Sequence, residues 1–248
     1  MLIAGLDLAA QPKGTAMSVL DCSGQSAKLL SLSLSVADED ILRATSDCEK
    51  IGIDCALGWP ITFAEFVAAY SRESLDGSSF DGGIDWRREL AYRETDREVH
   101  RLTGRWPLSV STDRLAMTAL RCAGLLTKLQ AAGVPVDRSG LGKVVEVYPA
   151  ASMRVWGLDF SGYRNSESIR IRLLGQLLNL APWLELDEFK DLMIASCDAF
   201  DSVIAALAAA SAALGKSNTP PQDKLQIAQI EGWVALPIGQ LSELNSWA

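Results

Sequence analysis

Three short apolar segments of the sequence each end in an acidic residue. They are "LIAGLD", "KIGID" and "KVVE", and their last residues are Asp7, Asp54 and Glu146. Their length and apolar content are typical of buried strands. In an open sheet with helical crossovers, ligands bind beyond the carboxyl ends of the strands. Because an unpartnered charge is costly in such a setting, we expect these acids to lie together at one edge of a sheet and to serve a function.

Two further strands are predicted directly after the first one. "TAMSVLD" follows a Pro-Lys-Gly turn, and "KLLSLSLSV" alternates apolar and polar residues after a second turn-rich stretch. Three strands joined by two short connections predict an antiparallel meander. Together with the later apolar segments, this pattern predicts an α/β fold with a mixed central sheet flanked by helices.

Helical periodicity dominates the rest of the chain. It predicts a helix at 61–70, two more at roughly 85–101 and 112–132, and a long helix from near 187 to about 214. Repeats, low-complexity tracts and linkers are not evident in the sequence. We therefore expect a single domain over residues 1–248 with a helical insertion at about 61–133.

The stretch "SCDAFDSVIAALAAA" places Asp198 and Asp201 three residues apart in front of an alanine-rich run. Residues at i and i+3 project from one helical face, so both carboxylates can reach a common point. One explanation is helix capping, with Asp198 as the N-cap and Asp201 at N3. The other is a metal site. Clustered carboxylates repel one another unless a cation neutralises them, and oxygen ligands without His or Cys favour Mg²⁺ or Mn²⁺.

Composition excludes several classes of protein. The net charge of −8 argues against loose, charge-driven binding to nucleic acid. No apolar run reaches the ~20 residues of a membrane span, and the first residues lack the pattern of a signal peptide. A zinc cage is not expected, because the chain has one histidine and five scattered cysteines without a CxxC motif. We expect reduced thiols and a cytoplasmic protein.

Arginines gather in one segment of this acidic chain. Between Arg87 and Arg121 there are eight arginines, five acids and no lysine, which makes the segment net +3. Within it, "YRETDREV" places Arg93 and Arg97 near two acids, so either residue is a candidate for binding a phosphate of the substrate. A surface ion pair explains Arg93 as well. Histidine is the residue type commonly used for proton transfer, so His100 is considered for that role, but a lone histidine on such a helix is more often merely exposed.

Several motifs together resemble the RNase H fold. A meander that begins with "GLDLA", a strand that ends in Asp54 and a late helix with "DAFD" are similar to the active-site plan of RuvC-type Holliday-junction resolvases. A closer resemblance, over nearly the whole chain, is to a family of predicted RNase H-like nucleases (domain of unknown function family 429). The motifs that carry it are "GLDLA", "GIDCALGWP", "YRETDREV", "VVEVYPA", "CDAFDSVIAALAA" and "EGWVALP".

The resemblance implies a metal-dependent nuclease. It assigns the metal-ligand positions to Asp7, Asp54, Asp198 and Asp201. Two Mg²⁺ or Mn²⁺ ions, ~4 Å apart in such enzymes, activate a water and stabilise the leaving oxygen of a phosphodiester in nucleic acid. Glu146 departs from this four-acid plan and is open to three interpretations: a fifth ligand, a base behind the ligands, or a structural acid.

Two other functions remain open. Actin-like kinases and ATPases also have a first strand that carries an aspartate, and their phosphate-binding hairpin has a glycine just after it. In this chain the first glycine after Asp7 is Gly14, in "DLAAQPKGT". "FDGGID" is a weak candidate for their adenosine loop. A non-catalytic protein that binds nucleic acid or serves as a scaffold is the second alternative.

Overall fold

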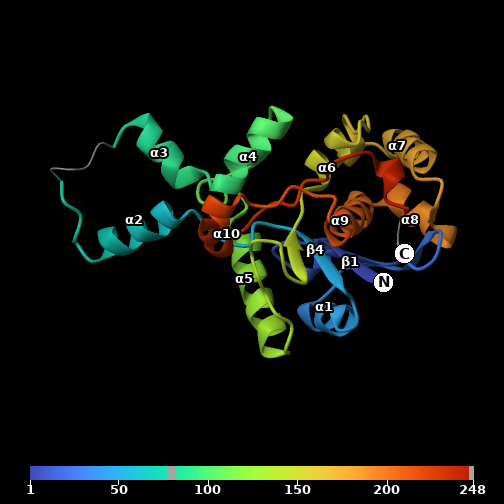
Figure 1. Ribbon diagram of the computed structural model, residues 1–248, viewed down its shortest axis with the longest axis horizontal. Helices are drawn as coiled ribbons and strands as arrows, with labels where there is room; N and C mark the ends of the chain where they lie inside the picture. The colour runs from blue at the N-terminus through green and yellow to red at the C-terminus, as the bar shows by residue number, and fades with distance from the viewer. Residues whose placement is uncertain (78–81, 246–248) are drawn as a thin grey trace.

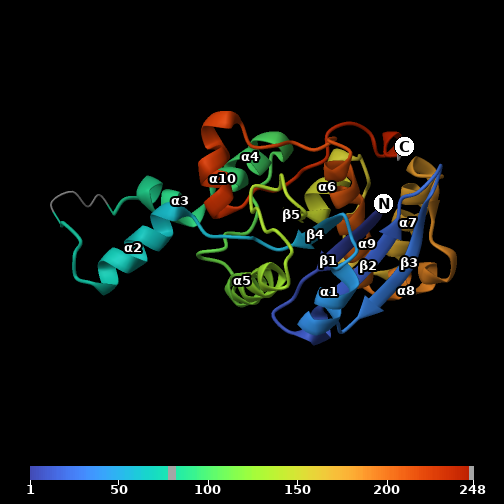
Figure 2. The same ribbon diagram turned by 60° about the horizontal axis from the view of Figure 1, so that its bottom comes forward.

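The computed structural model describes residues 1–77 and 82–245. Its centre is a six-stranded mixed sheet with the strand order β5-β4-β1-β2-β3-β6. The predicted α/β class and the mixed sheet flanked by helices are confirmed (Figures 1 and 2). The strands are β1 (Leu2–Asp7), β2 (Ala16–Asp21), β3 (Ala27–Leu34), β4 (Lys50–Asp54), β5 (Val144–Glu146) and β6 (Leu184–Glu185).

The first three strands form the predicted antiparallel meander. β1 pairs with β2 and β2 with β3, both antiparallel. On its other side β1 pairs with β4 in parallel, and β4 pairs with β5 in parallel. The short strand β6, which the sequence pattern did not predict, lies parallel to β3 at the far edge. The carboxyl ends of β1, β4 and β5 therefore meet at one edge of the sheet.

Helix α9 (Cys197–Ala213) packs directly on β1 and β4, as Figure 1 shows. The approach is so close that a Cβ atom on Gly5 would lie 2.1 Å from the carbonyl oxygen of Ser202. A Cβ on Gly52 would lie 2.7 Å from the carbonyl oxygen of Ala205. Glycine in both strands and small residues along the helix allow this contact, and this explains the alanine-rich run of the sequence.

The long late helix of the sequence prediction is in fact two helices. A single residue, Ser196, separates α8 (Lys190–Ala195) from α9, and it adopts an extended conformation. The Ser196 hydroxyl accepts a hydrogen bond from the Ala199 amide at 3.2 Å and caps α9. The interpretation of Asp198 as the N-cap was therefore wrong, because serine fills that position.

The opposite face of the sheet is covered by α1 (Asp38–Thr45) and α5 (Ala116–Ala131). Ile41 and Leu125 pack there against Leu6 and Ile53 of the central strands. The α9 face carries α6 (Pro149–Val155) and α7 (Glu167–Leu180), which join α8 and α9 in the larger core. The sheet is thus buried between two helical layers.

Between β4 and β5 the chain forms the helices α2 (Ile61–Ser71), α3 (Ile84–Ala91), α4 (Glu94–Thr103) and α5. The predicted helix at 85–101 is broken, because Tyr92 and Arg93 adopt extended conformations between α3 and α4. In Figures 1 and 2, α2 and α3 extend away from the sheet as an arm. The domain boundaries of the sequence analysis stay a prediction.

The last part of the chain returns to the sheet. After α10 (Leu225–Glu231), Val234 forms a parallel bridge with Glu146 beside β5. Of the described helices, none is both long and apolar enough to cross a membrane.

Candidate active site

Asp7 and Asp54 stand side by side at the ends of β1 and β4, where the two residues are paired in register. Side chains alternate along a strand, so each aspartate points to the same face as the glycine two residues before it. That face carries α9. Within the described residues, no hydrogen bond or ion pair reaches either carboxylate. The strand ends thus place two unpartnered acids next to each other.

Asp198 and Asp201 of α9 both lie close enough to Asp7 to act on it electrostatically, and Asp201 also acts on Asp54. Burial, followed by repulsion from Asp54, Asp201 and Asp198, raises the pKa of Asp7 to about 9. Burial and repulsion from Asp201 also raise the pKa of Asp54 well above its ordinary value. We call these residues the aspartate cluster: Asp7, Asp54, Asp198 and Asp201. The sequence prediction assigned these four acids to one site. Of the four, only Asp7 and Asp54 line the cavity beside the strand ends, and the assignment of all four as metal ligands stays a prediction.

Tyr163 and Arg164 complete the cluster, and sequence reasoning missed both. The Tyr163 hydroxyl contacts the two carboxylate oxygens of Asp201 at 2.8 and 2.9 Å. Burial raises the pKa of Asp201 to about 6, while the Tyr163 hydrogen bond and Arg164 oppose that rise. The Arg164 guanidinium lies 3.6 Å from Asp201, yet 58% of its side chain is exposed. Arg164 thus places a positive charge beside an acidic site. No motif or residue spacing in the sequence predicts that position.

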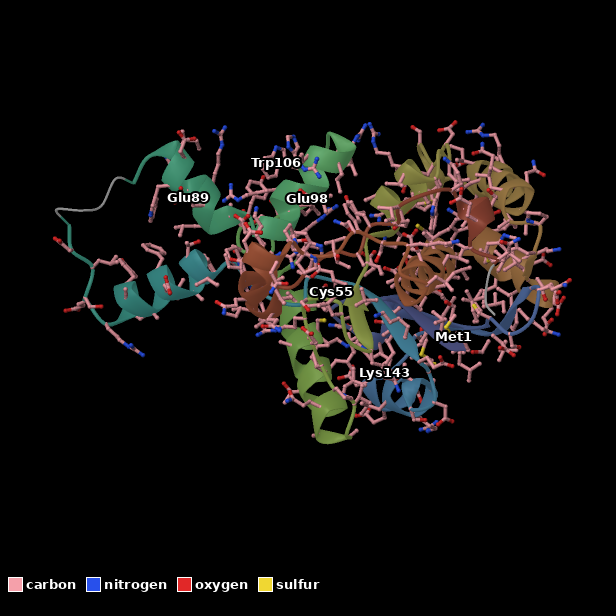
Figure 3. All side chains as sticks on the ribbon, viewed as in Figure 1. Met1, Cys55, Glu89, Glu98, Trp106 and Lys143 are labelled. Carbon is pink, nitrogen blue, oxygen red and sulfur yellow. The ribbon has the colours of Figure 1, made fainter. Side chains whose placement is uncertain are left out.

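A cavity of about 250 Å³ opens beside the two strand-end aspartates. Asp7, Asp54, Arg164 and Tyr148 supply its polar wall. Apolar side chains also line it, among them Leu8, Leu108, Leu115 and Val234. Cys55, which follows Asp54, also borders the cavity and is labelled near the centre of Figure 3. The lining of the cavity therefore combines charged and apolar side chains.

Glu146 belongs to a separate group of charges. It is paired with Ile53, so it points to the face opposite Asp54, away from α9. Its two oxygens accept hydrogen bonds from Arg93 at 2.7 and 2.8 Å, and one of them also accepts the Leu57 amide at 3.0 Å. Of its three interpretations, the structure supports the structural acid. Glu146 fixes the chain beyond β4 rather than joining the aspartate cluster.

Arg93 is the centre of that group, so its interpretation as a phosphate-binding residue was wrong. Only 3% of the residue is exposed. Its guanidinium donates to Glu146, to both oxygens of Asp96 at 2.9 and 3.2 Å, and to the Glu231 carbonyl at 3.1 Å. Every side of the guanidinium is engaged, which leaves no donor for a phosphate. We call Arg93, Asp96 and Glu146 the buried ion network; it forms the floor of the cavity.

Arg97 does not line the cavity. Its guanidinium pairs with Glu94 at 3.5 Å, and it lines a different hollow together with Glu231. The geometry thus gives no support for the prediction that Arg97 binds the substrate at the aspartate cluster. His100 is stacked on Trp106, with ring centroids 4.2 Å apart, and is partly exposed.

A comparison with protein families gives one match. The family model DUF429, described as a protein of unknown function, matches residues 5–226. The chain belongs to the DUF429 family. The comparisons with curated proteins and with solved structures found no match. The part that matches the DUF429 model includes the end of β1 with Asp7, the strands β4 and β5 and the helix α9. It therefore contains both the aspartate cluster and the buried ion network.

The donors of this DUF429 chain fit a divalent ion in type and in charge. The cluster offers carboxylate oxygens, and a bound cation would oppose the burial and repulsion that raise the pKa of Asp7 to about 9. In the described part of the chain, however, no three His, Cys, Asp or Glu side chains form a group that could hold one ion. The fold therefore brings the acids near one another, but their side chains do not converge on the position of a single ion.

Proposed function

We propose that this protein is a divalent-metal-dependent phosphodiester hydrolase that acts on nucleic acid. In this proposal the α/β sheet is an RNase H-like fold, and the acids follow the plan of RuvC-type resolvases. One observation carries it: Asp7 and Asp54 are adjacent, unpartnered and electrostatically coupled to the Asp198–Asp201 pair of α9. A group of acids with that much uncompensated charge is suited to a cation.

The aspartate cluster would hold two Mg²⁺ or Mn²⁺ ions. When bound, such ions supply positive charge at the phosphate and lower the pKa of an attacking water. Asp201 is oriented by the Tyr163 hydroxyl, so its carboxylate keeps one direction toward the cluster. Arg164 contributes a fixed positive charge for a phosphate oxygen. The buried ion network holds the floor of the cavity and takes no part in the chemistry.

The cell compartment is part of the same proposal. All five cysteines are free thiols, and three of them are buried. Thiols persist in the reducing cytoplasm, and we propose that the protein works there.

Two alternative functions are separated by the experiments rather than by the geometry. In the phosphotransferase alternative, "FDGGID" would contribute to an adenosine site, but its Phe80 and Asp81 lie outside the described residues. A phosphotransferase would bind ATP and transfer phosphate without cleaving nucleic acid. A scaffold would keep its function after the aspartates are replaced.

The test is hydrolysis of labelled DNA and RNA, each single-stranded, duplex and junction-shaped, with and without Mn²⁺. We expect cleavage only with the ion, and a loss of at least about a thousandfold in Asp7→Asn, in the range seen when catalytic groups are removed. Asp159→Asn is the matched control, since this acid is 64% exposed and lies in a surface ion pair. It should keep the parent rate. Equal cleavage by parent and Asp7→Asn, or no cleavage by the parent on any substrate, would contradict the proposal.

A further inference from the structure

One side chain in the cavity wall has a polar group without a partner. The Tyr148 ring packs against an apolar cluster of Val99, Ala151, Val234 and Leu236. Tyr148 also lines the cavity beside the aspartate cluster. In the described part of the chain, no hydrogen bond reaches its hydroxyl. A partly buried tyrosine hydroxyl usually has a partner. The fold thus holds the ring in place and leaves the hydroxyl free for a ligand.

Three charged groups lie near this hydroxyl. Burial and repulsion from Asp54 raise the pKa of Tyr148, while the guanidinium groups of Arg164 and Arg105 oppose that rise. Asp54 and Arg164 line the cavity together with Tyr148. Since electrostatic effects fall off with distance, the hydroxyl end of Tyr148 lies on the cavity side, near both of them. A phenol is protonated at neutral pH, so it can donate a hydrogen bond there.

Both arginines have donors that the protein does not use. The Nε atom of Arg164 donates to the Tyr163 hydroxyl at 3.3 Å, and a terminal nitrogen lies 3.6 Å from Asp201, yet 58% of the side chain is exposed. Arg105 is exposed, and in the described part of the chain it forms no ion pair. Arg93 is the opposite case, because its donors are all engaged within the protein.

The chain segment that carries Arg105 borders the same cavity. The Arg105 amide donates to the Thr103 hydroxyl at 3.3 Å, which ties this segment to the last residue of α4. Pro107 and Leu108, two and three residues further on, line the cavity. Arg105 therefore stands at the edge of the cavity on a backbone that α4 holds in place.

A phosphate group matches this set of donors. Arginine binds phosphate oxygens through two parallel hydrogen bonds, and tyrosine is among the side chains that donate to them. The chain has a net charge of −8, so two arginines with unused donors at one point are not a general property of its surface. A phosphate held here would also lie beside the aspartate cluster, where a bound cation would face it.

We propose that Tyr148, Arg164 and Arg105 form a subsite for one phosphodiester group of a nucleic-acid strand. The Tyr148 hydroxyl donates to an oxygen of that phosphate, and the two guanidinium groups supply positive charge. This inference rests on the proposed hydrolase activity and deepens it, because it places the phosphate of the substrate at the cavity wall. Tyr148 and Arg105 bind the substrate, and neither transfers a proton.

The first experiment measures binding in the absence of divalent ions, where no cleavage occurs. The probe is a fluorescein-labelled single strand of 12 nucleotides, titrated at several concentrations of sodium chloride. Tyr148→Phe keeps the ring and removes one neutral donor, so we expect it to raise the Kd about tenfold at every salt concentration. Arg105→Ala and Arg164→Ala each remove one charged contact to a phosphate. Each should therefore reduce the slope of log Kd against log salt by about 0.7.

Two variants on the distant arm are the matched controls. Arg88→Ala removes the same charge from α3, where the side chain is 62% exposed. Tyr70→Phe removes a hydroxyl from α2, where the residue is 69% exposed. Both should bind like the parent, and Tyr148→Phe should melt like the parent because its ring is kept. An unchanged Kd in Tyr148→Phe, or salt slopes of the Arg105 and Arg164 variants equal to that of Arg88→Ala, would overturn the subsite.

Inorganic phosphate distinguishes a strand from a free phosphate. Added as a competitor, it should displace the labelled strand no more than sodium chloride does at the same ionic strength. Displacement by micromolar phosphate that is weakened in Tyr148→Phe would mean that the subsite takes a free phosphate, and its assignment to a strand would be wrong.

The second experiment repeats the Mn²⁺-dependent cleavage assay with the same variants. A hydrogen bond to the bound phosphate is made before the reaction begins, so Tyr148→Phe should raise the KM about tenfold and change kcat little. A parent that cleaves the strand, with an unchanged KM in Tyr148→Phe, would overturn this inference and leave the proposed function standing. A parent that binds the strand through these three side chains and cleaves nothing would contradict the hydrolase and leave the subsite standing.

Discussion

Two groups of acids meet at the same edge of the sheet, and their surroundings are opposite. In the aspartate cluster, Asp7 and Asp54 are unpartnered, and burial with mutual repulsion raises the pKa of both. In the buried ion network, two carboxylates share one guanidinium at distances of 2.7 to 3.2 Å. In the described part of the chain, no cation pairs with Asp7 or Asp54, whereas Arg93 pairs with both carboxylates of the buried ion network.

The difference comes from the strand register, in which Glu146 is shifted by one residue relative to Asp54. Asp7 and Asp54 point toward α9, whereas Glu146 is paired with Ile53 and points to the opposite face, where Arg93 lies. In sequence all three are acids at the end of an apolar strand. Their location at a strand end makes all three acids candidates for a catalytic role. An acid that is already paired with an arginine of the same chain is no longer free to bind a metal ion or a substrate.

The largest expected effect tests the neutralised group. Arg93→Ala leaves Glu146 and Asp96 buried without a partner, and we expect it to lower the free energy of unfolding by about 3–5 kcal/mol. Arg164→Ala removes a guanidinium that is 58% exposed and should cost less than about 1 kcal/mol. Urea unfolding followed by circular dichroism measures both variants. Equal losses would mean that the two groups of acids do not differ as described.

A smaller effect tests the uncompensated group. Mn²⁺ at a hundredfold excess over its Kd should stabilise the parent by about 2.7 kcal/mol, by mass action. Asp7→Asn should gain much less, because it loses a ligand. Glu146→Gln is the matched control from the other group and should gain as much as the parent, whatever its own stability. Melting curves with and without Mn²⁺ measure the gain. If Asp7→Asn and Glu146→Gln gained the same stability from Mn²⁺, the two groups of acids would not differ in metal binding.

The smallest expected effect, taken over one pH unit, is a dependence of stability on pH. The pKa of Asp7 is raised to about 9 by burial and by repulsion from its neighbours. Between pH 4 and 9, the folded chain therefore binds a proton that the unfolded chain has released. The free energy of unfolding should fall as the pH rises through this window, by at most about 1.4 kcal/mol per pH unit for each proton. In Asp7→Asn without metal the slope should be smaller.

Asp38 supplies the control for this measurement. Hydrogen bonds from Lys128 and Arg121 outweigh its burial and lower its pKa, so its contribution is lost only as the pH falls below the ordinary range of an aspartate. Asp38→Asn should therefore leave the slope above pH 4 as in the parent. A slope that disappears in Asp38→Asn and persists in Asp7→Asn would show that the aspartate cluster is not the source.

The sequence predicted the sheet well because its signals are local. Alternation, apolar runs and turn residues define β1 to β5 within their own segments, and the acid at the end of each of three strands is visible by inspection. The pair Asp198 and Asp201 was also placed correctly on one helix. The predicted helix from 187 to 214 was too long, because a serine cap at Ser196 interrupts a pattern that is apolar on both sides.

What the sequence could not decide was which charges neutralise each other. The contact between Arg93 and Glu146 joins residues 53 positions apart, and Arg164 reaches Asp201 from a different element. No local pattern encodes such pairings, since they depend on how the insertion folds back on the sheet. The sequence alone determined the strands β1 to β5, the acids that end three of them, and the placement of Asp198 and Asp201 on one helix. The tertiary structure decided that Asp7 and Asp54 remain uncompensated while Glu146 is bound by a guanidinium, because side-chain direction and long-range packing set the partners of a buried charge.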